Sequence, residues 1–268
     1  MSEKLLNALM QLFAIFARPD SDASDRRLIV ESFLKQQLSQ ELVNKYLKVY
    51  DEEYSDALSE ITEQKEKAKQ QEAAGKKVNY EKLKFGLIGK LSARITKIGT
   101  YINSELEQRQ KIFVLVRLIE FIQAEQTDIL SLDREQEKEF TDLLVDLLHL
   151  KEEFQILHTF VANNFDEIPY STHLLIINND KNFSHPEVKH IYSEFLNGEI
   201  KIINIPTVNT QLFRTKRVGE LNINGQIVQE DVVNIISKGS AIRNNKIKPI
   251  YYSQIQSAYI ENNQQGKI

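Results

Sequence analysis

Two acidic loops have the residue types and spacing that could bind a metal ion. Asp20, Asp22 and Asp25 lie close together in the first loop, and Asp128 and Asp133 hold the matching place in the second. Clustered carboxylate oxygens are the ligands that hard cations such as Ca²⁺ prefer. Neither loop contains a glycine for a sharp turn, and the alternative is that these carboxylates face the positive ends of helices. We therefore expect no resident cofactor and at most a weakly bound divalent cation.

Ser240 and Arg243 form a second candidate site. They lie in the run GSAIR (239–243), at a predicted turn in the C-terminal part of the chain. Backbone amides of such a turn, together with a guanidinium fork, can bind a phosphate group. The alternative is an ordinary β-turn followed by an arginine that faces solvent.

No motif predicts catalysis. The chain has no cysteine, which excludes disulfides and thiolate chemistry. His149 and His158 are nine positions apart, on roughly opposite faces of a helix, and His185 and His190 have no obvious third metal ligand. The run GLIGKLS (86–92) lacks the spacing of a phosphate loop, so we expect its glycines to permit close helix packing or a kink. The sequence predicts that this chain is not an enzyme.

A repeated helix–loop–helix unit positions the acidic loops. Leu9 corresponds to Leu115 at a separation of 106 positions, and Ser24 to Ser131 at 107, so the register holds to one residue. Two such copies predict a pseudo-symmetric all-α bundle over residues 1–168. Within it, residues 62–80 are charged and nearly free of large apolar side chains. They are expected to form a solvated helical extension followed by a loop around Gly75.

The hydrophobic period changes from helical to alternating near residue 170. Leu174–Ile177 is typical of a buried strand, 199–205 alternates, and Asn224-Gly225 is a strong hairpin signal. These patterns predict a small all-β domain at 170–260, with a last strand at 250–252 and a polar linker at 261–268. The expected fold class is α+β by domain, with the helical bundle first.

Charge and hydropathy limit the partners. Residues 1–169 hold 23 basic against 30 acidic residues, whereas residues 170–268 hold 11 against 8, which supports two domains. No basic stripe interleaves with aromatic residues, so nucleic-acid binding is not expected. No apolar run approaches the roughly 20 residues that span a bilayer, and no signal peptide is evident. The expected location is the cytoplasm, with no direct membrane span.

Two resemblances refine these expectations. Residues 1–150 resemble a TerB-like tellurite-resistance domain, an internally duplicated helical domain whose acidic loops have been linked to metal binding. The resemblance rests on Leu9–Phe16, the turn ARPD (17–20), the helix start SDRR (24–27), Ile29 and Phe33-Leu34.

Residues 170–260 resemble the β segment that precedes the nucleotide-binding domain in large bacterial ABC transporter polypeptides, and are similar to forkhead-associated (FHA) domains. The runs that carry this resemblance are LNING (221–225), SKGSAIR (237–243) and PIYYS (249–253). It implies that the ATPase of the polypeptide would follow residue 268.

Three functions follow. The first is a non-catalytic cytosolic regulatory or interaction module of an ABC transporter ATP-binding protein. It would act at the inner face of the membrane on a protein partner or on the downstream transporter domains. The second is a metal-sensing or stress-response protein that uses the acidic loops. The third is a phosphopeptide-binding, FHA-like adaptor that uses Arg243.

Overall fold

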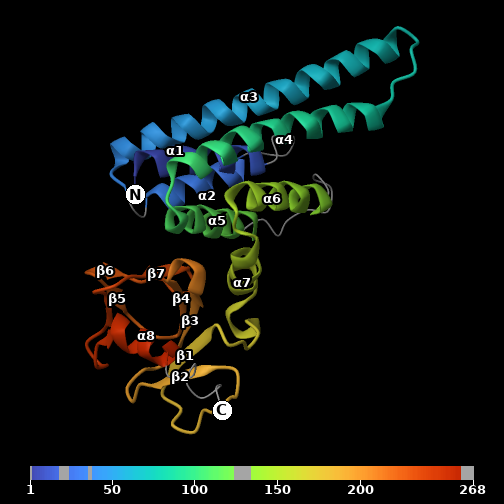
Figure 1. Ribbon diagram of the computed structural model, residues 1–268. Coiled ribbons are helices and arrows are strands. Elements are labelled where there is room, and N and C mark those ends of the chain that lie inside the picture. The colour runs from blue at the N-terminus through green and yellow to red at the C-terminus, as the bar shows by residue number, and fades with distance from the viewer. Residues whose placement is uncertain (1, 18–23, 36–37, 124–133, 261–268) are drawn as a thin grey trace. The chain divides into compact units, whose positions relative to one another are not determined.

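The computed structural model describes residues 2–17, 24–35, 38–123 and 134–260 (Figure 1). The chain is α+β, with seven α-helices before the first strand in these ranges. It divides into two compact units, Met1–Lys151 and Glu152–Ile268. The division falls at the start of α7 (Lys151–Ala162), whereas the sequence pattern placed the boundary near 168–170. Helix α7 therefore belongs to the second unit.

In the first unit, α1 (Glu3–Phe16) is the central helix and packs against α3 (Gln40–Ala73), α4 (Tyr80–Glu105) and α5 (Gln108–Gln123). Its side chains are apolar around most of the helix, and Leu9, Met10 and Leu12 are fully buried. Phe13 stacks on Phe121 of α5, with 4.6 Å between ring centroids. A helix that is apolar on nearly all sides needs neighbours on nearly all sides, and these three helices supply them.

Helices α2 (Ser24–Lys35) and α6 (Arg134–Leu148) complete the bundle. Arg27 of α2 forms a bidentate ion pair with Asp51 of α3: its Nε and Nη2 donate to the two carboxylate oxygens at 2.7 and 2.9 Å. Helix α6 packs against α4 at Gly99, where an added Cβ would lie 2.9 Å from a methyl carbon of Leu147. Gly99 is therefore a glycine that permits close helix packing. The expectation that the glycines of GLIGKLS (86–92) have this role is wrong, because both positions have room for a Cβ.

Helices α3 and α4 continue side by side past the other helices of the first unit (Figure 1). We call residues 62–90 the arm; they follow Ile61, buried in α3, and precede Leu91, buried in α4. Residues 69–84, at the far end of the arm, are its tip. Gly75 has φ +71° and lies in the turn that ends α3, a backbone conformation that glycine adopts without strain.

Polar contacts define both ends of the arm. At the tip, the Asn79 side chain accepts a hydrogen bond from the Lys82 amide at 3.0 Å, which caps α4. At the base, Arg94 of α4 donates to Glu53 and Glu60 of α3 at 2.5 and 3.1 Å. These bonds join the two helices just where the arm begins.

In the second unit, a five-stranded sheet has the order β2-β1-β3-β4-β7. Strands β1 and β2 run parallel, and the other described pairs of this sheet are antiparallel. The strands are β1 (Leu174–Asn178), β2 (Lys189–Tyr192), β3 (Glu199–Ile205), β4 (Thr210–Lys216) and β7 (Asn234–Ile236).

A smaller sheet, β6-β5-β8-β9, completes the β structure of this unit. It contains β5 (Asn222–Ile223), β6 (Gln226–Ile227), β8 (Ala241–Arg243) and β9 (Ile250–Tyr251). The predicted Asn224-Gly225 hairpin is confirmed as the β5–β6 turn, with φ +52° and +81°. The predicted linker at 261–268 lies outside the described residues.

This unit is not all-β as expected, because helices cover its large sheet. One face of that sheet packs on the small sheet and on α8 (Tyr252–Ile260), whose Tyr259 is part of that core. The Tyr259 hydroxyl donates to the carbonyls of His173 and Ile202, at 3.0 and 2.9 Å. The other face carries α7 and the short 3₁₀ helix η1 (Phe165–Glu167), through the contacts of Arg214 and Lys201 described below.

Two glycine substitutions in α4 should have different effects on the first unit. Gly89→Ala should raise the free energy of unfolding by about 1 kcal/mol, because alanine is the better helix former and nothing lies within 4 Å of the new methyl. Gly99→Ala should lie about 1–3 kcal/mol below Gly89→Ala, because the same gain is opposed by overpacking against Leu147. Urea unfolding followed by circular dichroism measures both. Equal stabilisation by the two substitutions would contradict the packing described at Gly99.

Truncation tests whether the second unit needs α7 in order to fold. Fragment 152–268 should unfold cooperatively on its own, whereas fragment 170–268 should not. The shorter fragment uncovers the face of the large sheet that bears Ile203 and the buried cations Lys201 and Arg214. Thermal unfolding followed by circular dichroism separates the cases, with fragment 1–151 as the companion measurement. A cooperative transition of undiminished midpoint for 170–268 would show that α7 is dispensable.

Candidate interaction surfaces

Most of the predicted metal ligands lie outside the described residues. Asp20, Asp22, Asp128 and Asp133 are outside them, and so is the side chain of Asp25, whose backbone is in the first turn of α2. Among the side chains that the structure does describe, no three His, Asp or Glu residues gather where they could hold a metal ion.

Ser240 uses its polar groups inside the second unit. The residue is 3% exposed; its hydroxyl accepts a hydrogen bond from the Asn224 side chain at 3.0 Å, and its amide donates to the Ser237 carbonyl at 2.9 Å. Ser240 thus connects the β5–β6 hairpin with the turn before β8. Arg243 is exposed at the end of β8, with its guanidinium 6.0 Å from the Tyr251 ring centroid. Of the predicted pair, only Arg243 presents a charged group at the surface.

His190 belongs to a polar chain rather than to a metal site. Its Nε2 lies 2.9 Å from Oδ1 of Asn178, and the Asn178 amide donates to Glu199 at 3.0 Å. The ring lies 4.8 Å from that of Phe183, centroid to centroid. Burial lowers the pKa of His190, and the charges of Asp180 and Glu199 only partly oppose this. Burial thus favours the neutral imidazole, which lies in hydrogen-bonding contact with Asn178.

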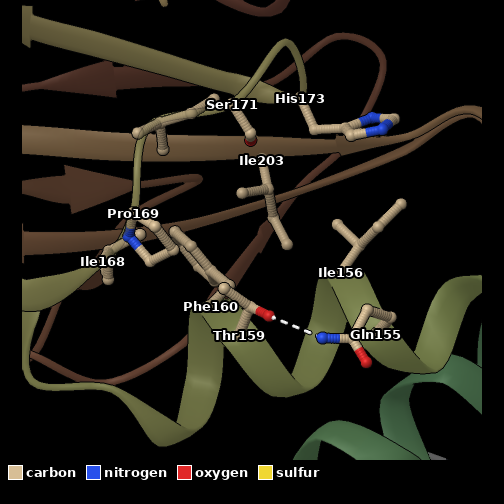
Figure 2. A pocket seen from close by; sticks show the side chains of 10 residues that line it. Gln155, Ile156, Thr159, Phe160, Ile168, Pro169, Ser171, His173 and Ile203 are labelled. Carbon is tan, nitrogen blue, oxygen red and sulfur yellow. Dashed lines mark hydrogen bonds between the residues drawn. The ribbon is translucent and has the colours of Figure 1, made fainter.

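A shallow pocket of about 190 Å³ lies between α7 and the large sheet (Figure 2). Its walls are mainly apolar, and the Gln155 amide donates to the Thr159 hydroxyl at 3.4 Å along its α7 side. The lining residues are Gln155, Ile156, Thr159, Phe160, Ile168, Pro169, Ser171, His173, Leu174 and Ile203. Pockets for cofactors and drug-sized ligands usually measure about 300–1,000 Å³, so this one suits a single apolar side chain.

Two buried cations attach α7 to the large sheet. Lys201 of β3 and Arg214 of β4 are register partners, 4% and 5% exposed. Arg214 donates to the carbonyls of Phe160 and Asn163 at 2.5 and 2.8 Å. Lys201 donates to the carbonyl of Phe165 at 2.8 Å. These carbonyls lie at and just beyond the C-terminal end of α7, where backbone acceptors have no helical donor and the helix dipole is negative.

The two cations differ in their compensation. Arg214 also donates twice to Asp231, at 3.0 and 2.6 Å, whereas the Lys201 ammonium lies 3.7 Å from the carboxylate of Glu199. Burial lowers the pKa of Lys201, and the charge of Glu199 opposes this in part. Arg214 is therefore the better compensated member of the pair, and Lys201 is buried at a cost.

The arm is the most exposed structured part of the first unit. It holds eight lysines and four glutamates, all exposed, whereas the rest of residues 1–151 holds fifteen basic and twenty-two acidic residues. Phe85 of the arm is 74% exposed and Tyr80 is 59% exposed. The Tyr80 hydroxyl donates to Glu72 at 2.6 Å, across the tip from α4 to α3. Phe85 and Tyr80 thus place two aromatic rings in water among the lysines of the arm.

Sequence reasoning identified the charge of the arm but not its exposed aromatic pair. The signal was present, since Phe85 falls away from the row Leu83, Leu87 and Leu91 by helical spacing. The buried cations were missed because an alternating strand pattern with a lysine or arginine is usual for a face in water.

No family model matches this chain, and no curated protein and no solved structure is significantly similar to it. In the described residues, no helix is both long and apolar enough to cross a membrane.

Substitution should separate the two buried cations. Arg214→Met should lower the free energy of unfolding by about 2–3 kcal/mol, because two carbonyls lose their charged donor and Asp231 loses its partner. Lys201→Met should change it by less than about 1 kcal/mol at pH 7, because it removes a costly buried charge together with one hydrogen bond. Urea unfolding at pH 7 measures both.

The pH dependence of unfolding tests independently whether the buried charge of Lys201 destabilises the folded chain. The pKa of Lys201 is lower in the folded chain than in the unfolded chain, so the cost of its charge is fully present below the folded pKa. That cost fades as the pH rises towards the ordinary lysine pKa of 10.5, and the wild type should gain stability relative to Lys201→Met over that range.

Lys216→Met is the control for Arg214→Met, since it removes only an exposed ion pair with Asp166, and exposed pairs contribute little. Equal losses from Arg214→Met and Lys216→Met would refute the role given to Arg214.

Proposed function

We propose that this chain is a non-catalytic interaction module, and that the arm is its contact surface. The observation that carries the proposal is the exposed arm, with Phe85 and Tyr80 in water among eight lysines. Two helices that pack only on each other are costly to extend past a core, because the added turns bury little apolar surface. An extension of this kind is suited to reach another surface.

The module belongs, in this proposal, to the ATP-binding polypeptide of an ABC transporter. The support for this finer step is the resemblance of residues 170–260 to the β segment that precedes the ATPase in such polypeptides. The runs SKGSAIR (237–243) and PIYYS (249–253) carry it, and they contribute β8, β9 and the start of α8. The module would then act in the cytoplasm, next to the transporter, and regulate or position it.

The described residues offer more to this proposal than to its rivals. A phosphopeptide reader needs accessible donors beside Arg243, but the Ser240 amide donates to the Ser237 carbonyl and the Ser240 side chain is buried, at 3% exposure. A metal sensor would depend on loop carboxylates whose side chains lie outside the described residues. We therefore advance neither as a second function.

Replacement of the arm tests the proposal. In the test variant, residues 65–84 give way to a short Gly-Ser turn, and the binding partner is the ATP-binding domain that this proposal assigns to the same polypeptide, produced separately. Calorimetric titration should detect binding by the wild type and a loss of at least tenfold in affinity for the variant, with both proteins equally folded by circular dichroism.

The isolated chain should hydrolyse no ATP above background. Hydrolysis by the wild type that is lost on Lys90→Ala would overturn the non-catalytic assignment.

The outcomes separate the two levels of the proposal. If the coding sequence after residue 268 holds no ATP-binding cassette, the transporter assignment fails. If it does, and the arm variant binds the ATP-binding part as tightly as the wild type, the arm is not the contact surface for it.

A further inference from the structure

We propose that the arm docks by its tip on an anionic lipid bilayer surface. This inference rests on the proposed function, in which the arm is the contact surface, and it names what the arm contacts.

Charge is the first argument. The arm has a net charge of +4, from eight lysines and four glutamates, within a unit whose remaining residues have a net charge of −7. The tip, residues 69–84, contains five of these lysines and two of the glutamates, Glu72 and Glu81. The five tip lysines are Lys69, Lys76, Lys77, Lys82 and Lys84. Most of the positive charge is therefore concentrated at the tip, and anionic headgroups attract such clusters without any shape match.

The exposed aromatic residues are the second argument. Tyr80 of the tip and Phe85, the residue directly after the tip, lie in the first two turns of α4, next to Lys82 and Lys84. Lysine beside tyrosine or phenylalanine is the chemistry of the membrane interface, where the ring enters the headgroup layer and the ammonium groups meet lipid phosphates. Ile88, half-buried and three residues after Phe85, lies on the same side of α4.

The shape of the arm is the third argument. The arm contains residues 62–73 of α3, a helical stretch roughly 18 Å long. Within the arm only Ala68 is buried, every arm residue being described, and the tip contains the end of α3, the connection to α4 and the start of α4 (Figure 1). A tip that is exposed on both of its helices can meet a flat, charged surface without a shaped pocket.

Vesicle binding tests the inference with the full chain. Sedimentation at about millimolar lipid, with vesicles of phosphatidylcholine and phosphatidylglycerol at about 7:3, a strongly anionic surface, should carry a measurable fraction of the protein down, and vesicles of phosphatidylcholine alone should not. Binding should weaken at least tenfold between low and high salt, because the attraction is electrostatic. Binding that is equal for the two vesicle types would overturn the inference.

A matched pair of charge reversals separates the tip from general charge. The triple variant Lys76→Glu, Lys77→Glu, Lys82→Glu should lose at least tenfold in binding to anionic vesicles. The triple variant Lys238→Glu, Lys246→Glu, Lys248→Glu makes the same change in net charge at exposed lysines of the second unit and should bind like the wild type. Equal losses in both variants would refute docking by the tip.

The aromatic contribution has its own variant. Phe85→Ser leaves the charge of the arm unchanged and removes its most exposed ring. Binding to anionic vesicles should weaken, because the ring no longer enters the headgroup layer. An unchanged affinity would contradict the part given to Phe85.

Failure of this inference is distinguishable from failure of the proposed function. Absence of vesicle binding, with arm-dependent binding to the ATP-binding part intact, would assign the arm to a protein and overturn only the lipid assignment. Analytical ultracentrifugation of the wild type tests for a salt-sensitive dimer. If such a dimer forms and is lost in the tip variant, the tip contacts a second copy of this chain instead of a bilayer.

Discussion

The burial of α1 on nearly all sides is the constraint on which the first unit depends. A helix whose circumference is largely apolar is stable only when neighbours cover it, and α3, α4 and α5 do so. Helix α1 has 14 residues, however, whereas α3 has 34 and α4 has 26. The parts of α3 and α4 beyond the end of α1 have no core helix to cover. They pair with each other instead, and the arm results from this difference in length.

The composition of the arm follows from the same constraint. On its α3 side, where only Ala68 is buried, the sequence places mainly lysine, glutamate and glutamine, whereas on its α4 side Leu83, Leu87 and Ile88 are half-buried. The pair Lys67–Glu63, one turn apart, supports α3 locally. Phe85 is mostly exposed, so it adds little packing to the arm and is available for a contact outside the unit.

The sequence predicted the elements better than their partners. The Asn224-Gly225 hairpin is a local signal, because it depends on the backbone conformation of two residues. The unit to which α7 belongs is not a local property. Its apolar face resembles that of a bundle helix, and only the position of the large sheet shows that α7 covers the sheet. The burial of Lys201 could not be predicted for the same reason, since an alternating strand pattern does not reveal that a helix lies over the face that bears the lysine. Gly99, rather than Gly86, packs closely because α6 crosses α4 there, which no pattern within α4 indicates.

Electrostatics sets the strength of the contact that the arm can make. Each lysine near an anionic bilayer contributes about 1 kcal/mol, so a net charge of +4 gives roughly 4 kcal/mol, or millimolar attraction before any aromatic insertion. One weak signal of this size does not anchor a protein, and stable attachment takes a second. A module joined to a transporter would have that second attachment through its own polypeptide. The arm would then orient the module on the membrane surface rather than recruit it.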